Sequence, residues 1–211
     1  MAAASGRVRA AWHPNRAGTL AVVEDLTGLV LAGGRSRRMG RDKALLEIDG
    51  RPLVERVAGR LATVCGRVLI AAGDRPLPPL PWDRVDDRVA DAGPLAGILG
   101  GLAAATTSLV AVAAVDMPDV DPGVFAALAT KWDGHAPAVV PLRAGRLEPL
   151  HAVYATAALP EFAALFDAGE RSPTQVLRRL SATVVVLEDD GAWAGNLNFP
   201  RDLARFTMGR E

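Results

Sequence analysis

One stretch of the sequence combines residue types that suit phosphate binding. Residues 29–43 read LVLAGGRSRRMGRDK, an apolar run that breaks at Gly33 and Gly34. Neither glycine carries a Cβ, so the backbone there can approach a ligand closely. The arginines that follow, together with Lys43, would surround a bound anion with positive charge. The pattern predicts a loop that cradles nucleotide phosphates, and a solvated charged loop is the alternative that fits the same residues.

This loop is neither of the two common glycine-rich phosphate motifs. No Gly-Lys-Ser/Thr follows at the Walker A spacing, and the glycines do not form Gly-x-Gly-x-x-Gly. Lysine occurs at only two positions, Lys43 and Lys131, so one of the two stands at the end of the loop. The prediction therefore depends on the combination of small residues with the arginines, above all Arg38, and with Lys43.

Acidic residues follow two other segments of strand-like sequence. Asp116 comes directly after the apolar run 109–115, and Asp86 and Asp87 follow a weaker strand. An aspartate in such a place suits Mg²⁺, which takes one or two carboxylates together with phosphate oxygens. Aspartate is equally common in turns and at helix N-caps, where it needs no ligand. The sequence leaves both interpretations open.

The remaining polar candidates are spread along the chain. Asn196 and Asn198 precede a proline-led helix, where Asn198 suits a cap and Asn196 is placed to orient a ligand. His151 lies in a predicted strand and is expected to be structural or substrate-contacting rather than a catalytic base. Cys65 is the single cysteine, which excludes an internal disulfide and a thiolate metal cluster. We expect it to be buried and inert.

Strand-like and helix-like segments alternate along the chain and must position these groups. Strands are expected at 27–31, 67–72, 84–86, 109–115, 138–142, 149–154 and 182–187. Helices are expected at 53–64, 95–105, 122–132, 157–168 and 174–180. Such alternation predicts an α/β fold, a three-layer Rossmann-like and mostly parallel sheet with helices on both faces. Ligands then bind beyond the carboxyl ends of the strands, where the loop and the acidic residues would meet.

Composition limits the classes of partner. The chain has 211 residues, half of them hydrophobic, which is enough for one domain with a sizeable core. Because 24 basic residues balance 24 acidic ones, a nucleic-acid partner is not expected. No apolar run approaches the roughly 20 residues that span a bilayer, so we expect a cytoplasmic protein without a membrane partner. Residues 1–25 are Ala-rich with no acid before Glu24, and we expect a disordered N-terminal extension there.

Five motifs occur along the chain in a fixed order. They are Leu31-Ala32-Gly33-Gly34 with Arg38-Met39-Gly40 and Asp42-Lys43, then Gly93-Pro94-Leu95-Ala96-Gly97-Ile98, Asp116-Met117-Pro118, Glu148-Pro149-Leu150-His151-Ala152-Val153-Tyr154 and Asn196-Leu197-Asn198-Phe199-Pro200. In this order they resemble the molybdenum cofactor guanylyltransferases, a family of Mg²⁺-dependent nucleotidyltransferases. The likeness runs from about Thr27 to Phe206. It implies a single nucleotidyltransferase domain over 26–211, with a nucleotide-diphospho-sugar transferase-like fold.

The resemblance also implies roles for individual residues. Those implied to bind the nucleotide are Leu31, Ala32, Gly33, Gly34, Lys43, Asp87, Asp116, Asn196 and Asn198. Lys43, Arg38 and Asp116 would be catalytic, and Asp116 would hold the Mg²⁺ cofactor. The family often uses an asparagine after the second strand, where this chain reads Ala71-Ala72-Gly73-Asp74 and departs from the pattern.

The implied reaction is attack by the terminal phosphate of molybdenum-molybdopterin on the α-phosphate of GTP, which releases pyrophosphate. The implied partners are GTP, molybdenum-molybdopterin, and molybdoenzyme acceptors or other cofactor-biosynthesis proteins. A cytidylyltransferase acting on the same cofactor is the nearest alternative. Those relatives tend to carry Leu-Ala-Ala-Gly in place of Leu31-Ala32-Gly33-Gly34 and to lack the Gly-Pro-Leu-Ala-Gly stretch. A relative that binds a nucleotide without turning it over is the alternative from another class.

Overall fold

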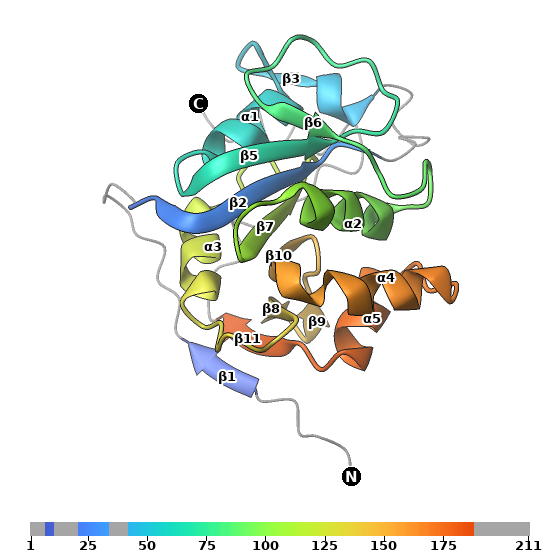
Figure 1. Cartoon of the computed structure of the whole chain (residues 1–211). Helices are drawn as coiled ribbons and strands as arrows, with labels where there is room; N and C mark the ends of the chain where they lie inside the picture. The colour runs from blue at the N-terminus through green and yellow to red at the C-terminus, as the bar shows by residue number, and fades with distance from the viewer. Residues whose placement is uncertain (1–6, 11–20, 34–41, 188–211) are drawn as a thin grey trace.

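A mixed β-sheet forms the centre of the protein (Figure 1). The computed structural model describes residues 7–10, 21–33 and 42–187. The nine strands of the sheet are β1 (Arg7–Ala10), β2 (Val23–Leu31), β5 (Cys65–Ala71), β6 (Asp83–Val85), β7 (Leu109–Ala114), β8 (Ala138–Arg143), β9 (Arg146–Leu147), β10 (His151–Ala155) and β11 (Thr183–Leu187). Their order is β1-β11-β8-β10-β7-β2-β5-β6, with β9 paired to β8. A two-stranded sheet joins β3 (Glu47–Ile48) to β4 (Arg51–Pro52).

Most neighbouring strands in the large sheet are parallel, as the sequence predicts. The exception within the main strand order is β10, which runs antiparallel to both β7 and β8. All six residues of β7 are buried, as are residues 26–31 of β2. Continuous apolar strands of this kind arise because helices exclude water from both faces of a parallel sheet.

Helices cover both faces of the sheet. They are α1 (Leu53–Leu61), α2 (Pro94–Ala104), α3 (Pro122–Ala129), α4 (Leu159–Asp167) and α5 (Pro173–Arg179), with 3₁₀ turns η1 (Lys43–Leu45) and η2 (Thr156–Ala158). A Cβ on Gly28 would lie 3.1 Å from Leu61 Cβ of α1, whereas Leu29 reaches α2. Successive side chains of a strand point to opposite faces, so α1 and α2 lie on opposite sides of β2.

The same argument places the other two large helices. On β10, the His151 ring stacks on Phe125 of α3, and the Tyr154 ring contacts Phe162 of α4. Positions 151 and 154 differ by an odd number and therefore face opposite ways. The three layers of helix, sheet and helix confirm the predicted α/β architecture (Figure 1).

Two short parts of residues 1–25 belong to strands of the sheet. Residues 7–10 form β1, which pairs in parallel with β11 from Arg7↔Val184 to Ala10↔Leu187. Residues 23–25 already belong to β2. Pairing satisfies the backbone N–H and C=O groups that the edge of β11 would otherwise leave exposed. Residues 1–6 and 11–20 lie outside the described part of the chain.

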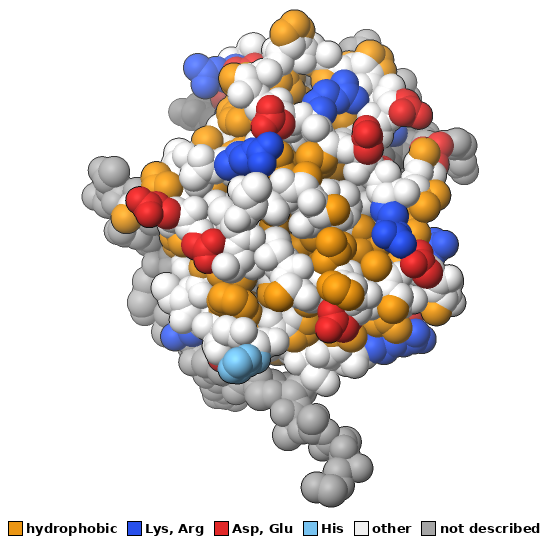
Figure 2. Space-filling model, viewed as in Figure 1, with side chains coloured by type: hydrophobic (Ala, Val, Ile, Leu, Met, Phe, Trp, Pro, Cys, Tyr) orange, Lys and Arg blue, Asp and Glu red, His pale blue; other side chains and the backbone are white. Residues whose placement is uncertain are grey.

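Charged side chains of both signs are mixed on the surface, as Figure 2 shows for one face. Two exposed ion pairs illustrate the pattern. Arg67 NH2 lies 2.7 Å from Asp83 Oδ2, and Arg88 NH2 lies 2.8 Å from Asp167 Oδ2. Such exposed pairs add little stability because solvent screens them. Within the described residues, no helix has the length and apolar character needed to cross a membrane.

Candidate active site

A cleft of about 1250 Å³ opens at the carboxyl ends of β2, β5 and β7. These strands end together because Ala32 N–H donates to Ala71 O at 2.8 Å and Val115 N–H donates to Leu31 O at 3.1 Å. The cleft is lined by residues from the ends of all three strands and from the start of α2. This is the edge at which a doubly wound α/β sheet is expected to bind a ligand.

The predicted phosphate-binding residues divide between the described and the undescribed parts of the chain. Leu31, Ala32 and Gly33 line the cleft where β2 ends. Gly34 and Arg38 lie outside the described residues, and so do Asn196 and Asn198.

Lys43 and Asp116 meet in the cleft. The Lys43 Nζ donates a hydrogen bond of 3.0 Å to Asp116 Oδ2, although 73 residues separate them in sequence. Local structure fixes the lysine, since it is the first residue of η1, whose N-cap Asp42 accepts from Ala44 N–H at 3.0 Å. Asp116 does not cap α3, because Asp121 takes that place and accepts from Gly123 N–H. The helix-cap interpretation of Asp116 is therefore wrong.

Asp87 lies on the same cleft, among glycines. A Cβ on Gly97 would lie 3.3 Å from a carboxylate oxygen of Asp87, which is tighter than usual, whereas a Cβ on Gly33 or Gly73 would make ordinary contacts of 3.8 and 3.7 Å. Burial is the main cause that raises the pKa of Asp87 above its ordinary value, and the charges of Asp86 and Asp91 add to the effect. A bound cation would relieve this unfavourable concentration of negative charge.

Two arginines that the sequence analysis did not single out shape another wall of the cleft. Arg75 lies in the segment after β5 and pairs with Asp42 Oδ2 at 2.9 Å. Arg84 donates from NH2 to the carbonyl oxygens of Gly73 and Arg75, both at 2.8 Å. The one sequence signal for Arg75 was its place just after a strand of the predicted parallel sheet. Arg84 gave no signal of its own.

His151 and Cys65 are structural residues. His151 is fully buried and stacks on Phe125 with ring centroids 4.4 Å apart. Burial, followed by the nearby charge of Arg143, lowers the pKa of His151 to about 3. Burial raises the pKa of the Cys65 thiol to about 12, which keeps it protonated and unreactive. The expectation of a buried cysteine is confirmed.

The acidic residues of the cleft fit a Mg²⁺ ion that arrives with a nucleotide. Within the described residues, no group of three or more His, Cys, Asp or Glu side chains could by itself hold a metal ion. Mg²⁺ needs only one or two carboxylates when phosphate oxygens and waters complete its shell. Asp116 and Asp87 both line the cleft and offer oxygen ligands of this kind.

Comparisons with known proteins identify the family of this chain. The family described as the MobA-like NTP transferase domain matches residues 28–184. The chain is 35% identical over 181 residues to the molybdenum cofactor guanylyltransferase of Pseudomonas fluorescens, covering 83% of this chain and 90% of the relative. It is 39% identical over 189 residues to the probable molybdenum cofactor guanylyltransferase of Mycobacterium ulcerans, covering 84% and 91%.

A solved structure shares the fold. The molybdopterin-guanine dinucleotide biosynthesis protein A of Archaeoglobus fulgidus superposes with a TM-score of 0.72 at 25% sequence identity. The match covers 87% of this chain and 98% of the other. The fold is therefore that of the nucleotide-diphospho-sugar transferases, and the chain belongs to the MobA-like NTP transferase family.

Proposed function

We propose that this protein transfers GMP from GTP to the terminal phosphate of molybdenum-molybdopterin and releases pyrophosphate. The observation that carries the proposal is the meeting of Lys43 and Asp116 at 3.0 Å in the cleft. A cation and a carboxylate held together at the carboxyl edge of this sheet suit the phosphates and the Mg²⁺ of a nucleotide. The names of the relatives supply the acceptor.

The chemistry is a displacement at phosphorus. An oxygen of the acceptor phosphate forms a new bond to the α-phosphorus of GTP, and the bond from that phosphorus to the β-phosphate bridging oxygen breaks. No covalent enzyme intermediate is required, because the attacking group is already a phosphate oxygen. The protein therefore acts by positioning the reactants and stabilising charge.

Each candidate site residue has a role in this scheme. Lys43, together with Arg38, stabilises the negative charge that grows on the leaving pyrophosphate. Asp116 and Asp87 would hold Mg²⁺, which would neutralise charge on the phosphate oxygens. The backbone N–H groups at Gly33 and Gly34 donate hydrogen bonds to the phosphates at close range. Asn196 and Asn198 complete the nucleotide site in this proposal.

The proposal of guanine as the base rests on two motifs of the sequence. Leu31-Ala32-Gly33-Gly34 and the stretch from Gly93 to Gly97 resemble the guanylyl rather than the cytidylyl members of the group. Both motifs border the cleft, since Gly33, Gly93, Pro94 and Gly97 line it. Delivery to molybdoenzyme acceptors or to other cofactor-biosynthesis proteins, in the cytoplasm, belongs to the same proposal.

Purified protein incubated with molybdenum-loaded molybdopterin, Mg²⁺ and either GTP or CTP tests the proposal directly. We expect pyrophosphate release with GTP and none with CTP. Chelation of Mg²⁺ with EDTA should stop the reaction, and fresh Mg²⁺ should restore it. Turnover with CTP alone would contradict the choice of base, and no turnover with any nucleotide would indicate a protein that only binds one.

A further inference from the structure

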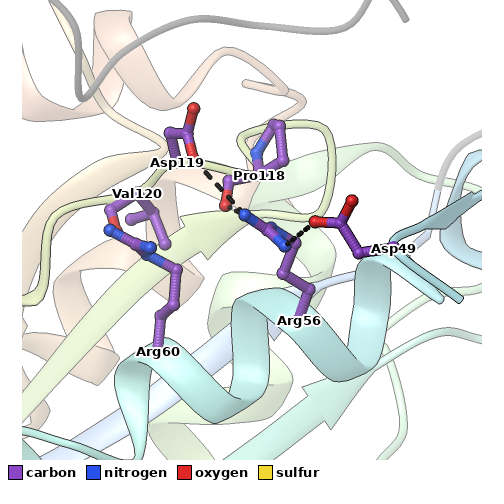
Figure 3. A network of polar contacts seen from close by, with 6 residues as sticks. All are labelled: Asp49, Arg56, Arg60, Pro118, Asp119 and Val120. Carbon is purple, nitrogen blue, oxygen red and sulfur yellow. Dashed lines mark hydrogen bonds and ion pairs between the residues drawn. The ribbon is translucent and has the colours of Figure 1, made fainter. Parts of the chain in front are cut away.

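Arg56 in the middle of α1 joins two segments that are distant in sequence (Figure 3). Its Nε donates to the carbonyl oxygen of Pro118 at 3.2 Å, and its NH2 lies 3.6 Å from Asp119 Oδ1. Its NH1 donates to Asp49 Oδ2 at 3.3 Å. The guanidinium thus contacts the loop after β7 on one side and the β3–β4 turn on the other.

These two segments carry Lys43 and Asp116, the ion pair of the candidate active site. Asp116 lies two residues before Pro118, in the same loop after β7. On the other side, the chain runs from Lys43 in η1 into the β3–β4 hairpin, whose turn contains Asp49. Leu53 N–H at the start of α1 donates to Leu46 O at 2.8 Å, which fixes this segment to the helix. Arg56 therefore links the segment of Lys43 to the segment of Asp116.

An arginine suits this position better than any other side chain. Its planar guanidinium presents several donors in a rigid fork, so one side chain can bind acceptors in different directions. The side chain of Arg56 is 15% exposed and that of Asp119 is 35% exposed, so solvent screens this contact less than a surface pair, whereas Asp49 is 65% exposed. One turn further along α1, Arg60 donates to the carbonyl oxygen of Val120 and holds the same loop (Figure 3).

We propose that Arg56 is a positioning residue that sets the separation and orientation of Lys43 and Asp116. Arg56 is not among the described residues that line the cleft, so it acts through the two segments rather than on the substrate. The carboxylates of Asp49 and Asp119 form ion pairs with its guanidinium and hold it in this orientation. The kinetic part of this inference rests on the proposed nucleotidyl transfer, but the geometric part does not.

The kinetic test compares Arg56→Gln with Arg67→Gln. Arg67 is a matched control because its guanidinium also pairs with an aspartate, Asp83, but lies at the amino end of β5, away from the cleft. We expect Arg56→Gln to lower kcat on the order of 10- to 100-fold, the scale of a small misplacement of reacting groups. The KM for GTP should stay close to the wild-type value. Arg67→Gln should leave both parameters unchanged.

A second test needs no activity and uses the fact that the chain has only two lysines, Lys43 and Lys131. In protein made with ¹³C-labelled lysine, each gives its own Cε signal, and Lys131→Arg assigns them. Asp116→Asn gives the position of the Lys43 signal without its carboxylate partner. We expect Arg56→Gln to move the Lys43 signal toward that position and to leave the Lys131 signal in place.

The measurements of kcat and of the Lys43 signal distinguish a failure of the positioning role from a failure of the proposed function. A Lys43 signal that does not move in folded Arg56→Gln protein overturns the positioning role, whatever the activity. A normal kcat in that variant overturns it as well. If the wild type turns over no nucleotide, the proposed function fails, and the Lys43 signal still decides the role of Arg56. Arg56→Lys, which keeps the charge but loses the fork, replaces Arg56→Gln if that variant does not fold.

Discussion

The ammonium of Lys43 donates a hydrogen bond of 3.0 Å to the carboxylate of Asp116. Their side chains are 17% and 22% exposed, so both are open to exchange of partners on the cleft side. A nucleotide with its Mg²⁺ would take over both groups, since phosphate oxygens suit the lysine and the cation suits the aspartate.

Replacement of Lys43 by alanine should lower kcat/KM for GTP by a factor of about 10²–10³. This corresponds to about 2–4 kcal/mol, the scale measured when one preorganised donor is removed from an active site. Lys131→Ala is the matched control, because Lys131 is the other lysine of the chain and is exposed. Steady-state release of pyrophosphate measures both. Equal rates for the two variants would remove Lys43 from the mechanism.

Asp87→Asn should stabilise the ligand-free protein and weaken GTP binding. Because burial and the neighbouring Asp86 and Asp91 raise the pKa of Asp87, its ionised form is unfavourable in the folded state at neutral pH. Asparagine removes this charge and also removes a candidate ligand for Mg²⁺. We expect a higher Tm without ligand and a smaller rise in Tm when Mg²⁺ and GTP are added. A lower Tm in the ligand-free variant would show that the charge is not the dominant effect.

Helix α2 is built to lie close to the sheet and to Asp87. A Cβ on Gly101 would lie 2.2 Å from Leu29 Cδ2, and a Cβ on Gly100 would lie 2.0 Å from the Asp86 carbonyl oxygen. A helix can approach a strand and a neighbouring loop this closely only where side chains are absent. The glycines of α2 therefore allow the loop with Asp86 and Asp87 to lie close to the helix, at the cleft.

Alanine substitutions at two helical glycines should have opposite effects. Gly100→Ala should destabilise the protein by about 1–3 kcal/mol, because the added methyl meets backbone that cannot move aside. Gly59→Ala in α1 should stabilise it by roughly 0.5–1 kcal/mol, since no atom lies within 4 Å of the added Cβ. Urea unfolding measures both changes. If the two variants were equally stable, the close approach of α2 would not matter to the fold.

The strands and helices that form the layers could be predicted from the sequence because their apolar patterns are strong. The helix expected at 95–105 is α2 at Pro94–Ala104, and the run at 109–115 is β7. The antiparallel direction of β10 could not be predicted, since an apolar pattern does not depend on chain direction. Short elements such as β9 have too few residues to show a period. The pairing of β1 depends on a neighbour more than 170 residues away.

The site was predictable to the extent that its residues belong to local motifs. Lys43 and Asp116 each follow a recognisable strand or loop, whereas Arg56 occupies a helical position that suits a solvated charge equally well. Its acceptor at Pro118 lies 62 residues further along the chain, so only the folded structure shows the link. The place of Arg75 in the site could not be predicted for the same reason, since its partner Asp42 lies 33 residues earlier.

At the scale of the whole molecule, the buried His151 makes stability sensitive to acid. Burial lowers its pKa to about 3 in the folded state, whereas the unfolded chain keeps a value near 6.5. Below pH 6.5 the unfolded state therefore binds a proton at His151, whereas the folded state does not. The free energy of unfolding consequently falls as the pH drops from 6.5 toward 3. From pH 7 to pH 5 this costs about 2 kcal/mol.

The variant His151→Phe isolates this contribution. A phenylalanine keeps an aromatic ring against Phe125 and cannot take up a proton. Urea unfolding at pH 7 and pH 5 should show a smaller loss of stability in the variant than in the wild type. An identical loss in both proteins would mean that other groups, such as the carboxylates, account for the acid sensitivity.

The central claim is that the cleft transfers the α-phosphate of GTP with its nucleoside, and the fate of a phosphorus label tests it most directly. Protein, Mg²⁺ and molybdenum-molybdopterin are incubated in parallel with [α-³²P]GTP and [γ-³²P]GTP, and the products are separated. We expect the α label in the dinucleotide product and the γ label in pyrophosphate, in equal amounts. A γ label on the acceptor, or an α label that never leaves free nucleotide, would contradict it.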